Sequence, residues 1–190
     1  FILSIIGLIF LLNKGLQDFN LLRFLSFLIY GISLSTMYIA STLYHNSKTP
    51  EGRYKFRLFD MVSIYLLIAG SYTPFTLTVL IDSGGLTLFL LVWVIAFIGI
   101  IWKIFTVGNY NFSSTLLYIF MGGLWLFFID AFINEIPQNA LMWIYASAST
   151  YLIGVFFYLA DSKIKYNHFI WHIFVILASA FHYISIYFYI

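Results

Sequence analysis

The feature that most restricts the fold of this chain is its succession of long apolar stretches. A helix needs about 20 apolar residues to cross the hydrocarbon core of a bilayer. Seven such stretches follow one another with short polar connections, at about residues 1–12, 21–45, 58–81, 86–105, 113–133, 140–160 and 168–190. We therefore predict an all-α membrane protein, a single domain over residues 1–190 formed by a bundle of seven transmembrane helices.

The composition excludes several other classes of protein. The chain is 63% hydrophobic and only 8% charged, whereas soluble domains carry about 25% charged residues. The stretches are too long for barrel strands and lack their apolar and polar alternation. The chain has no cysteine, so a transition-metal site would have to use His, Asp or Glu. A net charge of +2 without a basic tract gives no indication of nucleic-acid binding.

Proline and glycine predict where the helices end and where they approach one another. Pro50 and Gly52 suggest that the polar segment 46–57 is a loop. The sequence Asp82-Ser83-Gly84-Gly85 predicts a tight turn, and Pro74 is expected to kink the third helix. Close helix contacts are expected at small residues, here Gly70 and the pair Gly122-Gly123.

The first stretch is short for a membrane span. Because the chain begins with Phe1 and not Met, we expect preceding residues that continue this helix. The stretch is followed closely by further spans, so it does not resemble a cleaved signal peptide. Abundant Ile, Phe, Tyr, Asn and Lys are typical of an AT-rich genome, and we expect a bacterial inner-membrane protein.

The basic residues predict the orientation in the membrane. Under the seven-helix count only Lys14 and Arg23 fall on one side. Because basic loops stay in the cytoplasm, the other side is predicted to be cytoplasmic, with the N-terminus inside and the C-terminus outside. The residues on this cytoplasmic side are Lys48, Arg53, Lys55, Arg57, Lys103, Lys163 and Lys165.

Two histidines at the start of the last stretch point to metal binding. His168 and His172 are four residues apart, so a helix places both imidazoles on one face, roughly 6 Å apart. Such residues are costly inside a membrane and need a function or a partner. A single metal ion fits this spacing, although a polar clamp between helices is the alternative.

Three further polar residues are predicted at the same depth. His45 ends the second helix, Asp60 begins the third, and Ser41 lies one turn from His45 on the same face. Three imidazoles with an open fourth position are typical of catalytic zinc sites. Asp60 could complete the coordination or hold the metal-bound water as a general base, since zinc lowers the pKa of that water to about 7.

Each of these residues also has an ordinary structural interpretation. His45 could form hydrogen bonds at the membrane interface, Asp60 could pair with Arg57, and Ser41 could bond to a carbonyl of its own helix. His182 lies ten residues beyond His172, about 15 Å along a helix. It is too far for the same metal ion, and the sequence leaves its role open.

Four motifs follow one another in the chain: Ser41-Thr42-Leu43-Tyr44-His45, Phe59-Asp60, Ala69-Gly70-Ser71-Tyr72-Thr73-Pro74-Phe75 and His168-Phe169-Ile170-Trp171-His172. Together they resemble the hemolysin III family, the bacterial relatives of the progestin and adiponectin receptors, within a wider superfamily of membrane hydrolases that includes alkaline ceramidases. The resemblance covers essentially the whole chain and implies seven helices with the N-terminus inside. It implies zinc held by His45, His168 and His172, with Asp60 positioning a water and Ser41 beside it.

These observations favour a zinc-dependent hydrolase of lipid amide or ester bonds, whose substrate enters from the bilayer. Asp60 would take and return the proton, and Ser41 or the metal would stabilise the oxyanion. One alternative is a pore-forming, haemolytic protein with structural zinc, as the family name implies, although no ring of charges suggests a channel. The other is a receptor-like sensor of lipid.

Overall fold

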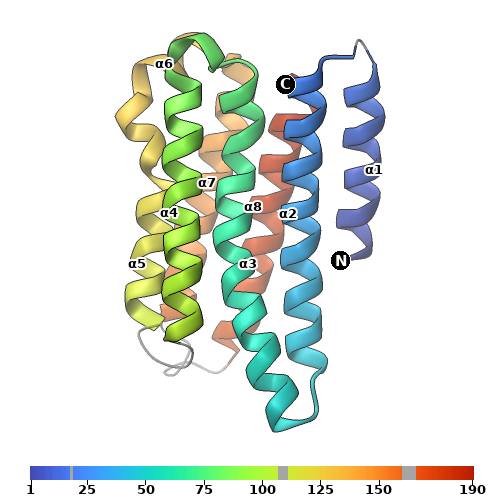
Figure 1. Ribbon diagram of the computed structural model, residues 1–190, viewed down its shortest axis with the longest axis vertical. Helices are drawn as coiled ribbons and strands as arrows, with labels where there is room; N and C mark the ends of the chain where they lie inside the picture. The colour runs from blue at the N-terminus through green and yellow to red at the C-terminus, as the bar shows by residue number, and fades with distance from the viewer. Residues whose placement is uncertain (18, 107–110, 160–165) are drawn as a thin grey trace. The chain divides into compact units, whose positions relative to one another are not determined.

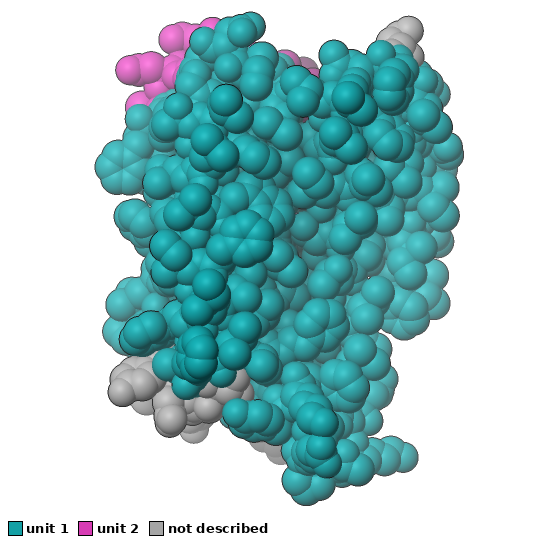
Figure 2. Space-filling model, viewed as in Figure 1, with its two compact units in different colours: residues 1–128 teal, residues 129–190 magenta. Residues whose placement is uncertain are grey.

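The computed structural model describes residues 1–17, 19–106, 111–159 and 166–190, and this part of the chain is helical without strands (Figure 1). By length and composition, six of the described segments can cross a membrane, and α1 (Ile2–Leu16) is a shorter apolar helix. The predicted all-α membrane class is therefore confirmed. The chain divides into two compact units, residues 1–128 and 129–190 (Figure 2).

After α1, the body of the first unit is formed by four helices. The longest is α3, and it packs along α2 on one side and α4 on the other. Gly70 permits the close approach of α3 to α2, because a Cβ there would lie 2.5 Å from Ser33 Oγ. The close contact predicted at Gly70 is thus confirmed. The helices are α2 (Leu21–Asn46), α3 (Pro50–Leu77), α4 (Leu86–Phe105) and α5 (Asn111–Gly122).

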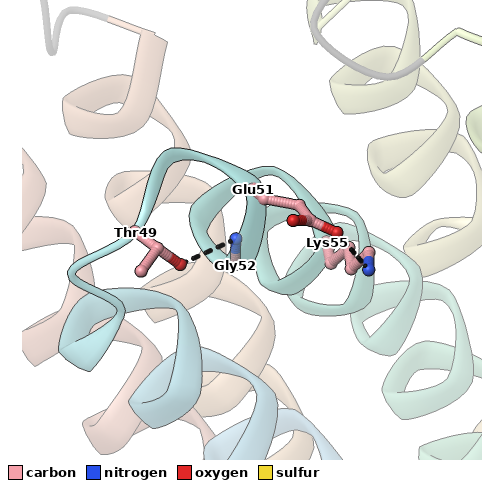
Figure 3. A network of polar contacts seen from close by, with 4 residues as sticks. All are labelled: Thr49, Glu51, Gly52 and Lys55. Carbon is pink, nitrogen blue, oxygen red and sulfur yellow. Dashed lines mark hydrogen bonds and ion pairs between the residues drawn. The ribbon is translucent and has the colours of Figure 1, made fainter.

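The start of α3 corrects the loop predicted at 46–57. Pro50 occupies the first turn of the helix, where its missing N–H costs nothing and its fixed φ is favourable. Thr49 Oγ1 accepts a hydrogen bond from the Gly52 N–H at 3.2 Å and so caps the helix (Figure 3). Lys55 Nζ pairs with Glu51 Oε1 at 2.7 Å, one turn apart. Pro50 and Gly52, which are predicted to lie in a loop, therefore belong to the first turn of the helix.

The turn between α3 and α4 lies where the sequence predicts it. The helix α3 ends at Leu77, four residues before the predicted boundary at 81. A short π-type segment, Ile81–Gly85, follows, and within it Gly84 has a φ of 88°. Glycine adopts this left-handed conformation without a steric cost, which other residues do not. The fourth helix then begins at Leu86, as predicted.

The segment after α4 is broken, contrary to the single helix predicted at 113–133. The helix α5 ends at Gly122 and a 3₁₀ segment, Leu124–Phe128, follows. Among the described residues nothing lies within 4 Å of a Cβ placed on Gly122, so the close helix contact predicted at Gly122-Gly123 is wrong. Instead these glycines mark the break.

A tyrosine of α3 satisfies the backbone at this break. The Tyr72 hydroxyl shares its proton between the carbonyl oxygens of Met121, at 3.0 Å, and Gly122, at 2.9 Å. Its oxygen accepts a hydrogen bond from the Trp125 N–H at 3.3 Å. Carbonyls at a helix end lack partners of their own, and a membrane interior offers no water to replace them. Tyr72, from the motif at 69–75, therefore makes the broken segment compatible with a membrane.

The second unit is built on two helices that lie side by side (Figure 1). Ser147 Oγ in α7 donates a hydrogen bond to the Ala178 carbonyl in α8 at 2.8 Å, and Ser185 Oγ in α8 donates to Ala140 in α7 at 3.0 Å. One of these hydrogen bonds joins the start of α7 to the end of α8, and the other joins the two helices near their middles. The helices of this unit are α6 (Ile129–Glu135), α7 (Gln138–Leu159) and α8 (Asn167–Tyr189).

The boundaries of α7 and α8 agree with the predicted segments 140–160 and 168–190 to within two residues, except that residue 160 lies outside the described part. Lys163 and Lys165, which contribute to the predicted orientation, also lie outside it.

Candidate metal centre

The two histidines of α8 meet at its first turns, as their spacing predicts. His168 Nε2 and His172 Nε2 are 3.1 Å apart. The ring centroids are 4.7 Å apart and the ring planes meet at 84°, so one ring presents its edge to the other. Both side chains are half-buried. The pair therefore presents two nitrogen atoms to one point in space.

The distance between these two nitrogens fits a shared metal ion. Zinc binds imidazole nitrogen at about 2.0–2.1 Å in tetrahedral sites, which places two ligand nitrogens roughly 3.3 Å apart. An N–H···N hydrogen bond between neutral rings has nearly the same length. The observed 3.1 Å thus serves both the metal interpretation and the polar clamp. Metal content, and not distance, separates the two.

In the first unit, Ser41 and Asp60 are brought together from neighbouring helices. The Ser41 hydroxyl in α2 donates a hydrogen bond to the Asp60 carboxylate in α3. Both side chains are half-buried. Sequence spacing related Ser41 to His45 but did not reveal this bond, because the register of α2 against α3 depends on the three-residue connection that joins them. In the described part of the chain no ion pair links Asp60 to Arg57.

His45 lies in the last turn of α2 and its side chain is exposed. The centroid of its ring is 4.9 Å from that of Tyr44, and the Arg53 guanidinium lies 5.7 Å from the Tyr44 ring. His45, Ser41 and Asp60 thus belong to the first unit, and His168 and His172 to the second. Sharing of one ion by all three histidines stays a prediction.

His182 also lies in α8 and is half-buried. Ten residues of helix separate it from His172, about 15 Å along the axis, so it does not belong to this pair. It therefore provides a control position on the same helix for experiments on the metal centre.

Apolar helices long enough to cross a bilayer, with a pair of histidines in the first turns of α8, define an integral membrane protein with a candidate metal centre. Comparison with known proteins identifies it further. Residues 1–183 match the family described as Haemolysin-III related, and the chain belongs to that family.

Two relatives are bacterial. The chain is 37% identical to "Hemolysin-3" of Bacillus cereus, over 100% of this chain and 86% of the relative. It is 34% identical to the "Hemolysin-3 homolog" of Bacillus subtilis (strain 168), over 99% and 88%. It is 30% identical to the human "Monocyte to macrophage differentiation factor", over 85% and 69%. No solved structure matches the chain.

With its apolar helices and bacterial relatives, the chain is an integral protein of a bacterial membrane.

Proposed function

We propose that this protein is a metal-dependent hydrolase of lipid amide or ester bonds, with zinc bound by His45, His168 and His172. The observation that supports the proposal is the pair of half-buried imidazoles in α8, whose nitrogens are 3.1 Å apart, a distance that a shared zinc ion fits as well as a hydrogen bond between the rings does. Each of the three histidines offers one ring nitrogen, and three such ligands leave one coordination position open. This is the plan of a catalytic zinc site, whereas structural zinc sites have four protein ligands.

The chemistry of the donor set fits zinc. The chain has no cysteine, and imidazole nitrogen is a ligand that zinc accepts readily. Zinc at this position would supply Lewis acidity and lower the pKa of a water molecule to about 7.

The chain itself supplies the proton acceptor. Asp60 is a half-buried carboxylate of α3, and the Ser41 hydroxyl of the neighbouring helix donates a hydrogen bond to it. One carboxylate oxygen bound in this way leaves the other to accept the proton of an attacking water and return it to the leaving group. A serine hydroxyl has a single proton. While Ser41 donates it to Asp60, that proton does not stabilise an oxyanion, so we assign Ser41 the role of positioning Asp60.

A lipid substrate suits a chain of this kind because it reaches the site from the bilayer. In the first unit, a shallow apolar depression of ≈ 420 Å³ lies between α4 and α5, and a surface of this kind is compatible with an acyl chain. It is lined by Ile98, Trp102, Ser113, Leu116, Leu117 and Phe120.

The first test measures metal by mass spectrometry on protein purified in detergent without chelators. We expect about one zinc ion per chain in wild type, a loss of about tenfold or more in His168→Ala and His172→Ala, and full retention in His182→Ala. Equal zinc in wild type and His172→Ala would refute the site.

The second test measures release of fatty acid from lipid amides and esters in proteoliposomes. Asp60→Asn should keep its zinc but lose activity by about 10²–10⁴-fold, the usual contribution of a general base. Ion flux from the same liposomes tests the alternative suggested by the name of the Bacillus cereus relative. Flux that survives His172→Ala, without any lipid turnover by wild type, would replace the hydrolase with a pore.

A further inference from the structure

The start of α3 is longer than a membrane span requires. The helix has 28 residues, about 42 Å at 1.5 Å per residue. The hydrocarbon core of a bilayer is about 30 Å thick, so roughly eight residues project from it. Figure 1 shows the start of α3 extending beyond the end of α4. The projecting residues are the polar ones, 50–57, because the other end of the helix is apolar.

This projection, with the connection before it, forms a basic surface that we call the α2–α3 tip (residues 47–57). Its single carboxylate, Glu51, is already paired with Lys55 at 2.7 Å. Tyr54 is 57% exposed, as is typical of aromatic residues in the interfacial layer of a membrane. The tip therefore carries a large excess of positive charge: its cations are Lys48, Arg53, Lys55 and Arg57.

The height of the tip matches the headgroup layer. A bilayer measures about 40–45 Å with its headgroups, so each headgroup layer is roughly 5–8 Å thick. A projection of about 12 Å passes through this layer and ends just beyond it. The basic side chains of residues 53–57 are thus held at the depth of the lipid phosphates by a rigid, capped helix.

We propose that the α2–α3 tip binds the phosphate headgroup of an anionic phospholipid. The binding surface adjoins His45, one of the proposed zinc ligands, because Arg53 lies 5.7 Å from the ring of Tyr44 and His45 follows Tyr44. The proposal does not depend on hydrolysis, since a headgroup bound here needs only charge and position. Each basic residue near a charged membrane surface contributes about fivefold in affinity.

The test is native mass spectrometry of the full chain, released from nanodiscs that contain equal phosphatidylglycerol and phosphatidylcholine. We expect wild type to retain phosphatidylglycerol preferentially, and the triple variant Arg53→Gln/Lys55→Gln/Arg57→Gln to lose about a hundredfold in that preference. The charge-keeping variant Arg53→Lys/Arg57→Lys should retain it. Lys14→Gln, at the opposite end of the first unit, is the matched control.

Several outcomes would overturn the proposal. One is equal retention of the two lipids by wild type, and another is an unchanged preference in a triple variant that elutes as folded protein. Competition by inorganic phosphate as strong as that by phosphatidylglycerol would show a site for the free anion instead. The His172→Ala protein, measured in parallel, separates this proposal from the hydrolase, because its lipid preference should be unchanged whether or not zinc and turnover are lost.

Discussion

Replacing Tyr72 with phenylalanine removes one hydroxyl group and leaves the ring in place, so no cavity forms. The change deletes the bonds to the carbonyls of Met121 and Gly122, at 3.0 and 2.9 Å, and the weaker bond from the Trp125 N–H at 3.3 Å. It leaves polar backbone groups of a broken helix without their partner inside the protein. We therefore expect the Tyr72→Phe variant to be less stable than wild type.

Two measured scales bracket the size of this effect. Hydrogen bonds between membrane helices average about 0.6 kcal/mol, because the groups find other partners in the unfolded state. A buried group that loses its only partner costs about 1–3 kcal/mol. Tyr72 is only 8% exposed, and its hydroxyl donates to two carbonyls at a helix end, where other donors are scarce. We therefore expect the cost of leaving these buried groups without a partner to dominate, and the free energy of unfolding to fall by about 2 kcal/mol.

Unfolding by sodium dodecyl sulfate in maltoside micelles, followed by tryptophan fluorescence, measures this difference. Trp125 lies at the break and contributes to this signal together with the other four tryptophans of the chain. Tyr54→Phe is the matched control, since that side chain is 57% exposed and should change stability little. If Tyr72→Phe unfolds within about 0.5 kcal/mol of wild type, the hydroxyl does not stabilise the break.

Other predictions follow from single features of the described helices. Thr49→Ala should lower the free energy of unfolding by about 1 kcal/mol through loss of the cap, and Thr49→Ser should not; the same titration measures both. Gly84→Ala should cost about 1–2 kcal/mol, because a side chain is strained at a φ of 88°. Gly70→Ala should cost about 1–3 kcal/mol by pushing Ser33 away, and Ser33→Gly should restore most of it; retained stability in Gly70→Ala alone would contradict the packing of α2 on α3. Chelation of zinc should lower the melting temperature of wild type but not that of His172→Ala, as measured by differential scanning fluorimetry.

The fold was largely predictable because hydropathy and length set the spans. The boundaries at 21–46 and 86–105 differ from prediction by at most one residue. The predicted start of the third helix at residue 58 is wrong, because proline and glycine do not always end a helix, and here Pro50 and Gly52 lie in its first turn. Proline favours the first turn of a helix as strongly as it disfavours the interior, and the threonine before Pro50 was the signal that distinguishes the two. Hydropathy also does not predict the break after Gly122, because a broken and a continuous membrane helix have equally apolar side chains.

The candidate site was predictable only as far as local spacing reaches. The meeting of His168 with His172 follows from the helical repeat. The bond between Ser41 and Asp60 joins two helices, and its existence depends on their register, which no periodicity specifies. Participation of His45 in the same metal site is likewise a long-range question, and it stays a prediction for metal analysis.

The connection between α2 and α3 consists of residues 47–49 alone, and this has a consequence for biogenesis. So short a link makes α2 and α3 a helical hairpin. Ser41 and Asp60 lie within that hairpin, so we expect the carboxylate to acquire its hydroxyl partner when these two helices pair. His168 and His172 lie in α8, the last helix to be synthesised, so we expect them to join after that bond can form.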